Sequence, residues 1–219
     1  MKTAVIVFPA SNCDRDAQVA LRQATGAEPE MIWHAESALP EGLDLVVLPG
    51  GFAHGDYLRC GAIAARSKIM DAVIARAKTG GPTLGICNGF QILCESGLLP
   101  GALMTNANQH FISREVTLRV EANDSPFTNG YDSGAYTRFP VAHHDGNYQA
   151  QDDVLDRLEG EGRVAFRYVE PINGAARNIA GIVSEDRKIL GMMPHPERAM
   201  AEGADGEVFF RQAISALAA

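Results

Sequence analysis

GPTLGICNGFQIL, residues 81–93, is the segment that decides the fold expected of this chain. Its apolar start predicts a short buried strand, Cys87 lies where a tight turn is expected, and the remainder predicts a helix. Gly85 and Gly89 bracket the cysteine at two-residue spacing, as glycines bracket the nucleophile in a G-x-S-x-G elbow. A sharp turn from strand to helix needs glycine there, because the backbone is crowded. The segment therefore predicts a nucleophile elbow.

Cys87 is the candidate nucleophile of this elbow. The helix that follows would direct its free N–H groups and its partial positive charge at the sulfur. This arrangement favours the thiolate, which is the reactive form of cysteine. A small buried cysteine at the start of a core helix would fit the same segment equally well, so catalysis needs support from a second group.

Composition restricts the class of protein. The chain has 219 residues, of which 46% are hydrophobic, and we expect residues 1–219 to form a single domain with a full core. A net charge of −8 argues against nucleic acid or an anionic membrane as a partner. The N-terminus does not resemble a signal peptide, and no apolar run is long enough to span a bilayer. The cysteines lack zinc-site spacing, so we expect no metal, reduced thiols and a cytoplasmic location; they are Cys13, Cys60, Cys87 and Cys94.

Upstream of the elbow, apolar runs alternate with helical patterns. A continuous apolar run is typical of a strand that is buried on both faces of a parallel sheet. Strands are expected at 3–8, 29–33 and 43–48, with a first helix that ends before Gly26 and a long helix at 58–78. This order of elements predicts βαβ units and a parallel sheet.

Downstream of residue 101 the pattern changes to alternation, which is typical of half-exposed strands. Strands are expected at 114–121, 138–142, 163–168 and 179–183, then a hairpin partner at 189–193 and a final helix at 207–217. The expected fold class is therefore α/β, with a mostly parallel central sheet that is flanked by helices and carries an antiparallel extension.

The segment Pro194-His195-Pro196-Glu197 offers a base and an acid for the thiol. Both prolines resist helix and favour an extended chain, in which residues two apart point the same way. Glu197 could then orient the His195 imidazole toward Cys87. The order nucleophile, histidine, acid differs from that of α/β-hydrolases, in which the histidine comes last. A rigid loop end without any catalytic role is the alternative explanation for this segment.

Acyl transfer also requires hydrogen-bond donors for an oxyanion. The N–H of Asn88 directly follows the nucleophile and is one candidate. The second is expected in the Gly50-Gly51 loop, which follows a strand and would lie at the carboxyl edge of the sheet, although an ordinary tight turn would look the same. Gln91, four residues after Cys87 on the same helical face, could meet a polar substrate, with a solvated helix face as the alternative.

These motifs carry a resemblance to a known family. Residues 85–91 (GICNGFQ) and 194–197 (PHPE) resemble the nucleophile and histidine–glutamate motifs of class I, or triad-type, glutamine amidotransferases, whose fold is flavodoxin-like. More narrowly, the chain resembles the glutaminase subunits of phosphoribosylformylglycinamidine synthases. Four further segments carry that closer match: FPASNCDRD (8–16), LPGGFAHGDYLR (48–59), GLLPGAL (97–103) and RNIAGI (177–182).

The resemblance implies hydrolysis of glutamine to glutamate and ammonia by Cys87, His195 and Glu197. It also implies an oxyanion hole built from the N–H groups of Gly51 and Asn88. Ammonia would pass to an ATP-dependent synthetase subunit of purine biosynthesis, in a complex that contains a third, small subunit. No cofactor is expected in this chain, whereas ATP and Mg are expected in the synthetase.

The chain differs from the family at a few positions, and two other functions remain possible. The family usually has glycine at Ala10 and His144 and glutamate at Asp145, so these positions receive no catalytic role. A Cys-elbow hydrolase or peptidase on a similar sheet would need neither Gln91 nor a partner subunit. A non-catalytic binding subunit would lack an intact triad, whereas this chain has all three candidates. Glutaminase assays alongside ester and peptide substrates separate the first two possibilities.

Overall fold

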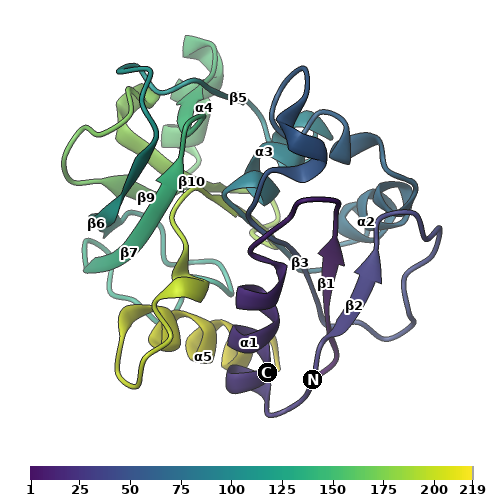
Figure 1. Cartoon of the computed structure of the whole chain (residues 1–219). Helices are drawn as coiled ribbons and strands as arrows, with labels where there is room; N and C mark the ends of the chain where they lie inside the picture. Colours follow the sequence, from purple (N-terminus) through teal and green to yellow (C-terminus); the bar gives the residue numbers. More distant parts are fainter. Residues whose placement is uncertain (219) are drawn as a thin grey trace.

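A nine-stranded sheet runs through the computed structural model, which describes residues 1–218 (Figure 1). Its strand order is β2-β1-β3-β4-β11-β10-β9-β6-β7, and a separate two-stranded sheet pairs β5 with β8. The strands are β1 Thr3–Val7, β2 Glu30–Trp33, β3 Leu45–Leu48, β4 Thr83–Ile86, β5 Ala102–Met104, β6 Ile112–Val120, β7 Tyr136–His143, β8 Asn147–Gln149, β9 Val164–Tyr168, β10 Ile179–Val183 and β11 Ile189–Met192.

The sheet has a parallel half and an antiparallel half. β1, β2, β3, β4 and β11 pair in parallel, and β10, β9, β6 and β7 continue the sheet in antiparallel pairs. β3 and β4 are buried at every position, which explains their continuous apolar runs. The expected fold class, mostly parallel with an antiparallel extension, is confirmed.

The described part of the chain has five α-helices. They are α1 Asp14–Thr25, α2 Lys68–Lys78, α3 Asn88–Glu95, α4 Asp152–Gly160 and α5 Asp205–Leu217. α1 packs against α5, while α3 packs on β3, β4 and β11 (Figure 1). Seven of the eight residues of α3 are buried, because the helix is enclosed by the sheet and by neighbouring loops. None of the helices described within residues 1–218 has the length and apolar character that crossing a membrane requires.

The long helix expected at 58–78 is wrong in its first half. Short 3-10 turns occur at Ala53–Asp56 and Ala64–Arg66, and α2 begins only at Lys68. Leu58 and Gly61 have φ values of 70° and 79°, which lie outside the right-handed helical region and stop an α-helix from forming there. The apolar residues of this segment therefore belong to an irregular loop rather than to a helix.

The structure agrees with the expected hairpin and contains strands and a helix that were not predicted. The hairpin between β10 and β11 is confirmed, and β11 also pairs in parallel with β4. Three elements were not predicted from the sequence: β5 and β8, which have three residues each, and α4. β11 thus carries the chain from the antiparallel half back to the centre of the sheet, beside the strand that precedes Cys87.

Candidate active site

The strand, turn and helix expected for residues 81–93 are present as β4, Cys87 and α3. Cys87 has φ 51° and ψ −106°, a backbone conformation that side-chain-bearing residues rarely adopt. A Cβ on Gly89 would lie 2.0 Å from the Leu48 carbonyl oxygen, and one on Gly85 would lie 2.5 Å from Leu93 Cδ1. The bracketing glycines are therefore required by contact with β3 and α3, as an elbow demands.

His195 and Glu197 form a buried pair. His195 Nδ1 lies 2.5 Å from Glu197 Oε1, and each side chain is only 1% exposed. The extended segment expected here is wrong, because Pro196–Arg198 forms a 3-10 turn for which His195 is the N-cap. Proline suits the first position of a helical turn, since its φ is already helical and its missing N–H is not needed. The two side chains meet across this turn rather than along a strand.

The charge of His195 follows from its neighbours. Burial lowers the pKa of His195, but the Glu197 carboxylate and the nearby thiols of Cys87 and Cys13 outweigh burial and raise this pKa well above its usual value. Burial, together with the like charge of His195, lowers the pKa of the neighbouring His143 to about 4. At neutral pH the site therefore holds one imidazolium beside a neutral imidazole.

The parallel topology brings the site residues to one edge of the sheet. Cys13 follows β1 and its loop, Gly50 follows β3, Cys87 follows β4 and His195 follows β11. A Cβ on Gly50 would lie 2.7 Å from His195 Cε1 and 3.4 Å from Cys87 Cβ, so both side chains flank this glycine. Neighbouring parallel strands end at the same edge, which is where open α/β sheets bind ligands.

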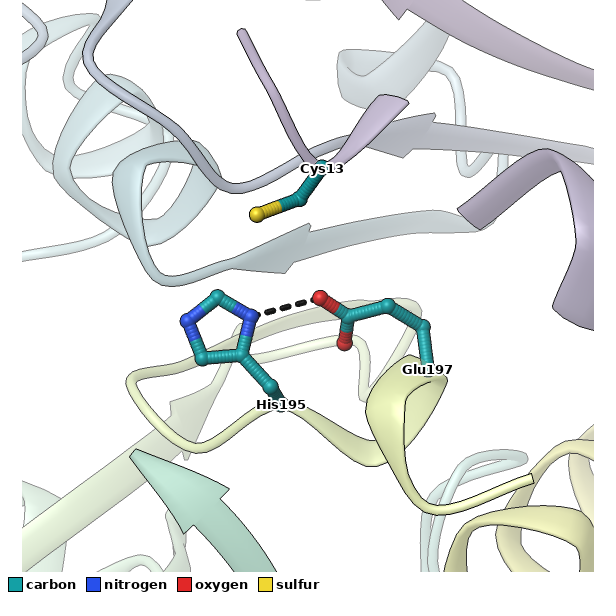
Figure 2. Close-up of side chains that lie close together, drawn as sticks. All are labelled: Cys13, His195 and Glu197. Atoms are coloured by element: carbon teal, nitrogen blue, oxygen red, sulfur yellow. Dashed lines mark hydrogen bonds and ion pairs between the residues drawn. The ribbon is translucent and has the colours of Figure 1, made fainter. Parts of the chain in front are cut away.

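Cys13 is a site neighbour that the sequence analysis missed. Figure 2 shows its thiol beside the His195–Glu197 pair, and the three side chains offer possible ligand atoms within 4.8 Å of one another. Such a set could hold a metal ion, but the hydrogen bond between His195 and Glu197 already accounts for two of the three groups. The available signal was the position of Cys13 after β1, at the same sheet edge as Cys87.

The two expected oxyanion donors lie on either side of the elbow. Gly51 has φ 138°, and a Cβ there would lie 2.6 Å from Ser11 Cα, so only glycine fits. Asn88 is the first residue of α3, where an N–H has no partner within the helix. Within residues 1–218, neither N–H donates a hydrogen bond to another protein group. Neither N–H is therefore held in place by a protein acceptor among the described residues.

The side-chain amide of Gln91 forms hydrogen bonds within the protein. Its Oε1 accepts a hydrogen bond of 2.7 Å from Asn88 Nδ2, and its Nε2 donates one of 2.7 Å to the Asp145 carbonyl. The Asn88 amide also accepts from Ala53 N–H at 3.1 Å and donates to Asp56 at 3.2 Å. Gln91 thus ties the loop after β7 to α3, and Asn88 ties the loop after β3 to the same helix.

The space in front of the dyad is small and has an aromatic rim. A cavity of about 80 Å³ is lined by residues that include Cys13, Gly51, His195 and Arg198. Phe52 and Phe111 also line it, about half exposed, with ring centroids 6.5 Å apart. Pockets for small ligands usually measure about 300–1,000 Å³, so this cavity is smaller than a usual ligand pocket.

Fold and site define a class: a cysteine-dependent amidotransferase on a mostly parallel α/β sheet. The family model of the CobB/CobQ-like glutamine amidotransferase domain matches residues 1–208. Two relatives described as phosphoribosylformylglycinamidine synthase subunit PurQ are similar. The relative from Novosphingobium aromaticivorans is 57% identical, and the match covers 98% of this chain and 97% of the relative. The relative from Nitrobacter winogradskyi is 62% identical, and the match covers 90% of this chain and 88% of the relative.

A solved structure supports the same family assignment. A chain in the structure of PurLQS from Thermotoga maritima matches with a TM-score of 0.89 and 44% identity, over 98% of this chain and 97% of that one. The chain belongs to the family of PurQ glutaminase subunits of phosphoribosylformylglycinamidine synthase. The resemblance of its motifs to class I glutamine amidotransferases is thereby confirmed.

Proposed function

We propose that Cys87, His195 and Glu197 form the catalytic triad with which this chain hydrolyses glutamine to glutamate and ammonia. The observation that carries the assignment is the buried His195–Glu197 pair, 2.5 Å apart, at the sheet edge where the Cys87 elbow ends. The raised pKa of His195 favours an imidazolium, which can protonate the departing nitrogen. The pair therefore supplies the acid for the reaction, and the elbow supplies the nucleophile.

The reaction then follows in two acyl-transfer steps. The Cys87 thiolate attacks the side-chain amide carbon of glutamine, and the N–H groups of Gly51 and Asn88 stabilise the resulting oxyanion. His195 gives its proton to the departing nitrogen, which leaves as ammonia, and a glutamyl thioester remains on Cys87. His195 next takes a proton from water, whose oxygen attacks the thioester to release glutamate.

Gln91 has a supporting part in this proposal. Its amide holds the Asp145 loop against α3, and we assign this arrangement to binding of the polar end of glutamine. No metal takes part in the proposed reaction. The residues 1–219 act together as one amidotransferase domain.

The ammonia is used by a partner. The family name and the Thermotoga maritima structure support a complex with an ATP-dependent synthetase subunit and a small third subunit. In this complex the synthetase, with ATP and Mg, converts formylglycinamide ribonucleotide to the amidine in purine biosynthesis. We place the complex in the cytoplasm, where no nucleic acid or membrane is needed for its function.

The test compares two nitrogen sources in the assembled enzyme. Cys87→Ser should abolish amidine synthesis from glutamine and leave synthesis from added ammonia at the wild-type rate, because nitrogen release and nitrogen use occupy different subunits. Cys94→Ser is the matched control, since Cys94 is buried elsewhere on α3 and should not affect either rate. Retention of glutamine-dependent synthesis by Cys87→Ser would refute the assignment.

A further inference from the structure

The largest cavity among those described lies outside the candidate active site. It measures about 730 Å³ and lies between the end of β2, the loop after β3 and the start of α2. We call it the basic pocket, and its walls include His34, His54, Leu58, Arg59, Arg66 and Lys68. None of the described residues that line it is acidic, although the whole chain carries a net charge of −8. The pocket is therefore a local site of positive potential on an acidic protein.

Two of its cations are exposed to incoming groups. Arg59 already forms a two-point ion pair with Glu95, with N–O distances of 2.8 and 2.6 Å. Arg66 and Lys68 are exposed and lie on either side of Ser67, the N-cap of α2. They can therefore meet a carboxylate without first giving up a partner as Arg59 would.

The rim of the basic pocket presents apolar side chains to solvent. Leu58 is 92% exposed and the adjacent Tyr57 is 75% exposed. Three residues of this loop have a left-handed backbone, with φ values of 70° at Leu58, 56° at His54 and 52° at Asp56. This conformation costs energy in residues other than glycine. Exposed apolar side chains on a strained loop are typical of a surface that meets another protein. A small hydrated anion would leave this rim uncovered.

The same loop is hydrogen-bonded to both ends of the nucleophile helix. Ala53 N–H and Asp56 contact the Asn88 side chain at the start of α3, and Arg59 contacts Glu95 at its end. Gly51, a proposed oxyanion donor, lies two residues before Ala53. A ligand that moves or holds this loop would therefore act directly on both oxyanion donors.

We propose that the basic pocket docks an aspartate or glutamate side chain of the synthetase subunit, with Leu58 and Tyr57 covered by apolar residues beside that acid. The proposal rests on the function proposed above and names the surface on which the partner acts. Docking there restrains the loop of residues 52–60 and so completes the oxyanion hole formed by Gly51 and Asn88.

The test is a charge reversal at the exposed cations, Arg66→Glu with Lys68→Glu. Binding is measured by biolayer interferometry with the synthetase and small subunit of the same organism, in the presence of their nucleotide substrates. We expect the dissociation constant to rise at least about tenfold, mainly through slower association, and its salt dependence to become weaker. The glutaminase rate of the isolated chain should not change, because neither residue contacts the triad.

The control is Arg157→Glu, a single charge reversal at an exposed arginine on α4, which is separate from α2 in Figure 1. Leu58→Asp is a second variant that removes the apolar rim, and aspartate tolerates the left-handed backbone at this position. Unchanged affinity in the charge reversal and in Leu58→Asp, or an equal loss in Arg157→Glu, would overturn the proposal.

Two further measurements separate the alternatives. Saturable binding of sodium phosphate or ATP to the wild-type chain, lost in the charge reversal, would show a small-anion site and overturn partner docking. The binding comparison is repeated on a Cys87→Ser background, which lacks the proposed nucleophile. If the wild-type complex fails to hydrolyse glutamine, the proposed function fails, while the Cys87→Ser binding series still decides whether this surface docks the partner.

Discussion

Replacing Glu197 with glutamine tests how the candidate dyad works. The substitution keeps the size and shape of a side chain that is buried and lies 2.5 Å from His195 Nδ1, but it removes the negative charge. A hydrogen bond to a charged group contributes about 1.5–3 kcal/mol and a neutral one about 0.5–1.5 kcal/mol. The expected loss is therefore about 1–1.5 kcal/mol, which corresponds to about a tenfold fall in kcat/KM.

The pH profile gives a second, independent readout of the same change. Burial lowers the pKa of His195, and Glu197 is the largest of the causes that raise it. Without the carboxylate, burial has more weight, so the pKa falls and the imidazolium is lost at lower pH. We therefore expect the alkaline limb of the kcat/KM profile to move to lower pH.

The free energy of unfolding should also depend on pH through the pKa of His195. The folded-state pKa of His195 lies above the unfolded value of about 6.5, so the stabilisation by this pair is fully present below that pH. It is lost as the pH rises through the folded-state pKa. Urea unfolding of the wild type should therefore show a decline over that alkaline range that is smaller in Glu197→Gln.

The assay is glutaminase activity of the assembled complex from about pH 6 to pH 10, with Glu202→Gln as a control. Glu202 is exposed, and its substitution makes the same change in net charge. His195→Ala should be more damaging than Glu197→Gln, because it removes the proton donor itself. An alkaline limb that stays in place in Glu197→Gln, or equal losses in the two variants, would refute this account of the pair.

Three other predictions concern the nucleophile, the glycine loop and the partner. An electrophilic glutamine analogue should label Cys87, which mass spectrometry of the digested chain would detect. Burial raises the pKa of Cys60 and Cys94 and keeps these thiols protonated and unreactive. Dominant labelling of Cys13 or Cys94 would contradict the assignment. Gly50→Ala places a methyl group 2.7 Å from His195 Cε1 and should lower kcat by about 10–100-fold with the fold retained in circular dichroism, whereas Gly160→Ala meets nothing within 4 Å and should have no effect on kcat. Steady-state kcat should be low for the isolated chain and rise strongly with the synthetase and its nucleotide substrates, because a glycine peptide can turn its N–H toward or away from the oxyanion at little steric cost; equal kcat in all states would show a preformed site.

Much of this protein could be predicted from the sequence because the evidence is local. Continuous apolar runs and glycine pairs indicated the parallel half of the sheet, and Gly85 and Gly89 indicated the elbow around Cys87. The order of Cys87, His195 and Glu197 along the chain argued against the lipase type of hydrolase. The strands and the elbow depend on side-chain periodicity and on backbone crowding, which act within a few residues and can therefore be recognised from the sequence.

The tertiary structure decided what depends on contacts between distant segments. Leu58 and Gly61 occupy left-handed conformations because their loop packs on α3, and this packing overrides the helical spacing of residues 58–67. Cys13 reaches the His195–Glu197 pair only because β1 ends at the same sheet edge as β4 and β11. His195 and Glu197 meet across a 3-10 turn whose place is set by the pairing of β11 with β4. The raised pKa of His195 likewise arises from neighbours that the fold assembles around a buried imidazole, which no local pattern of residues encodes.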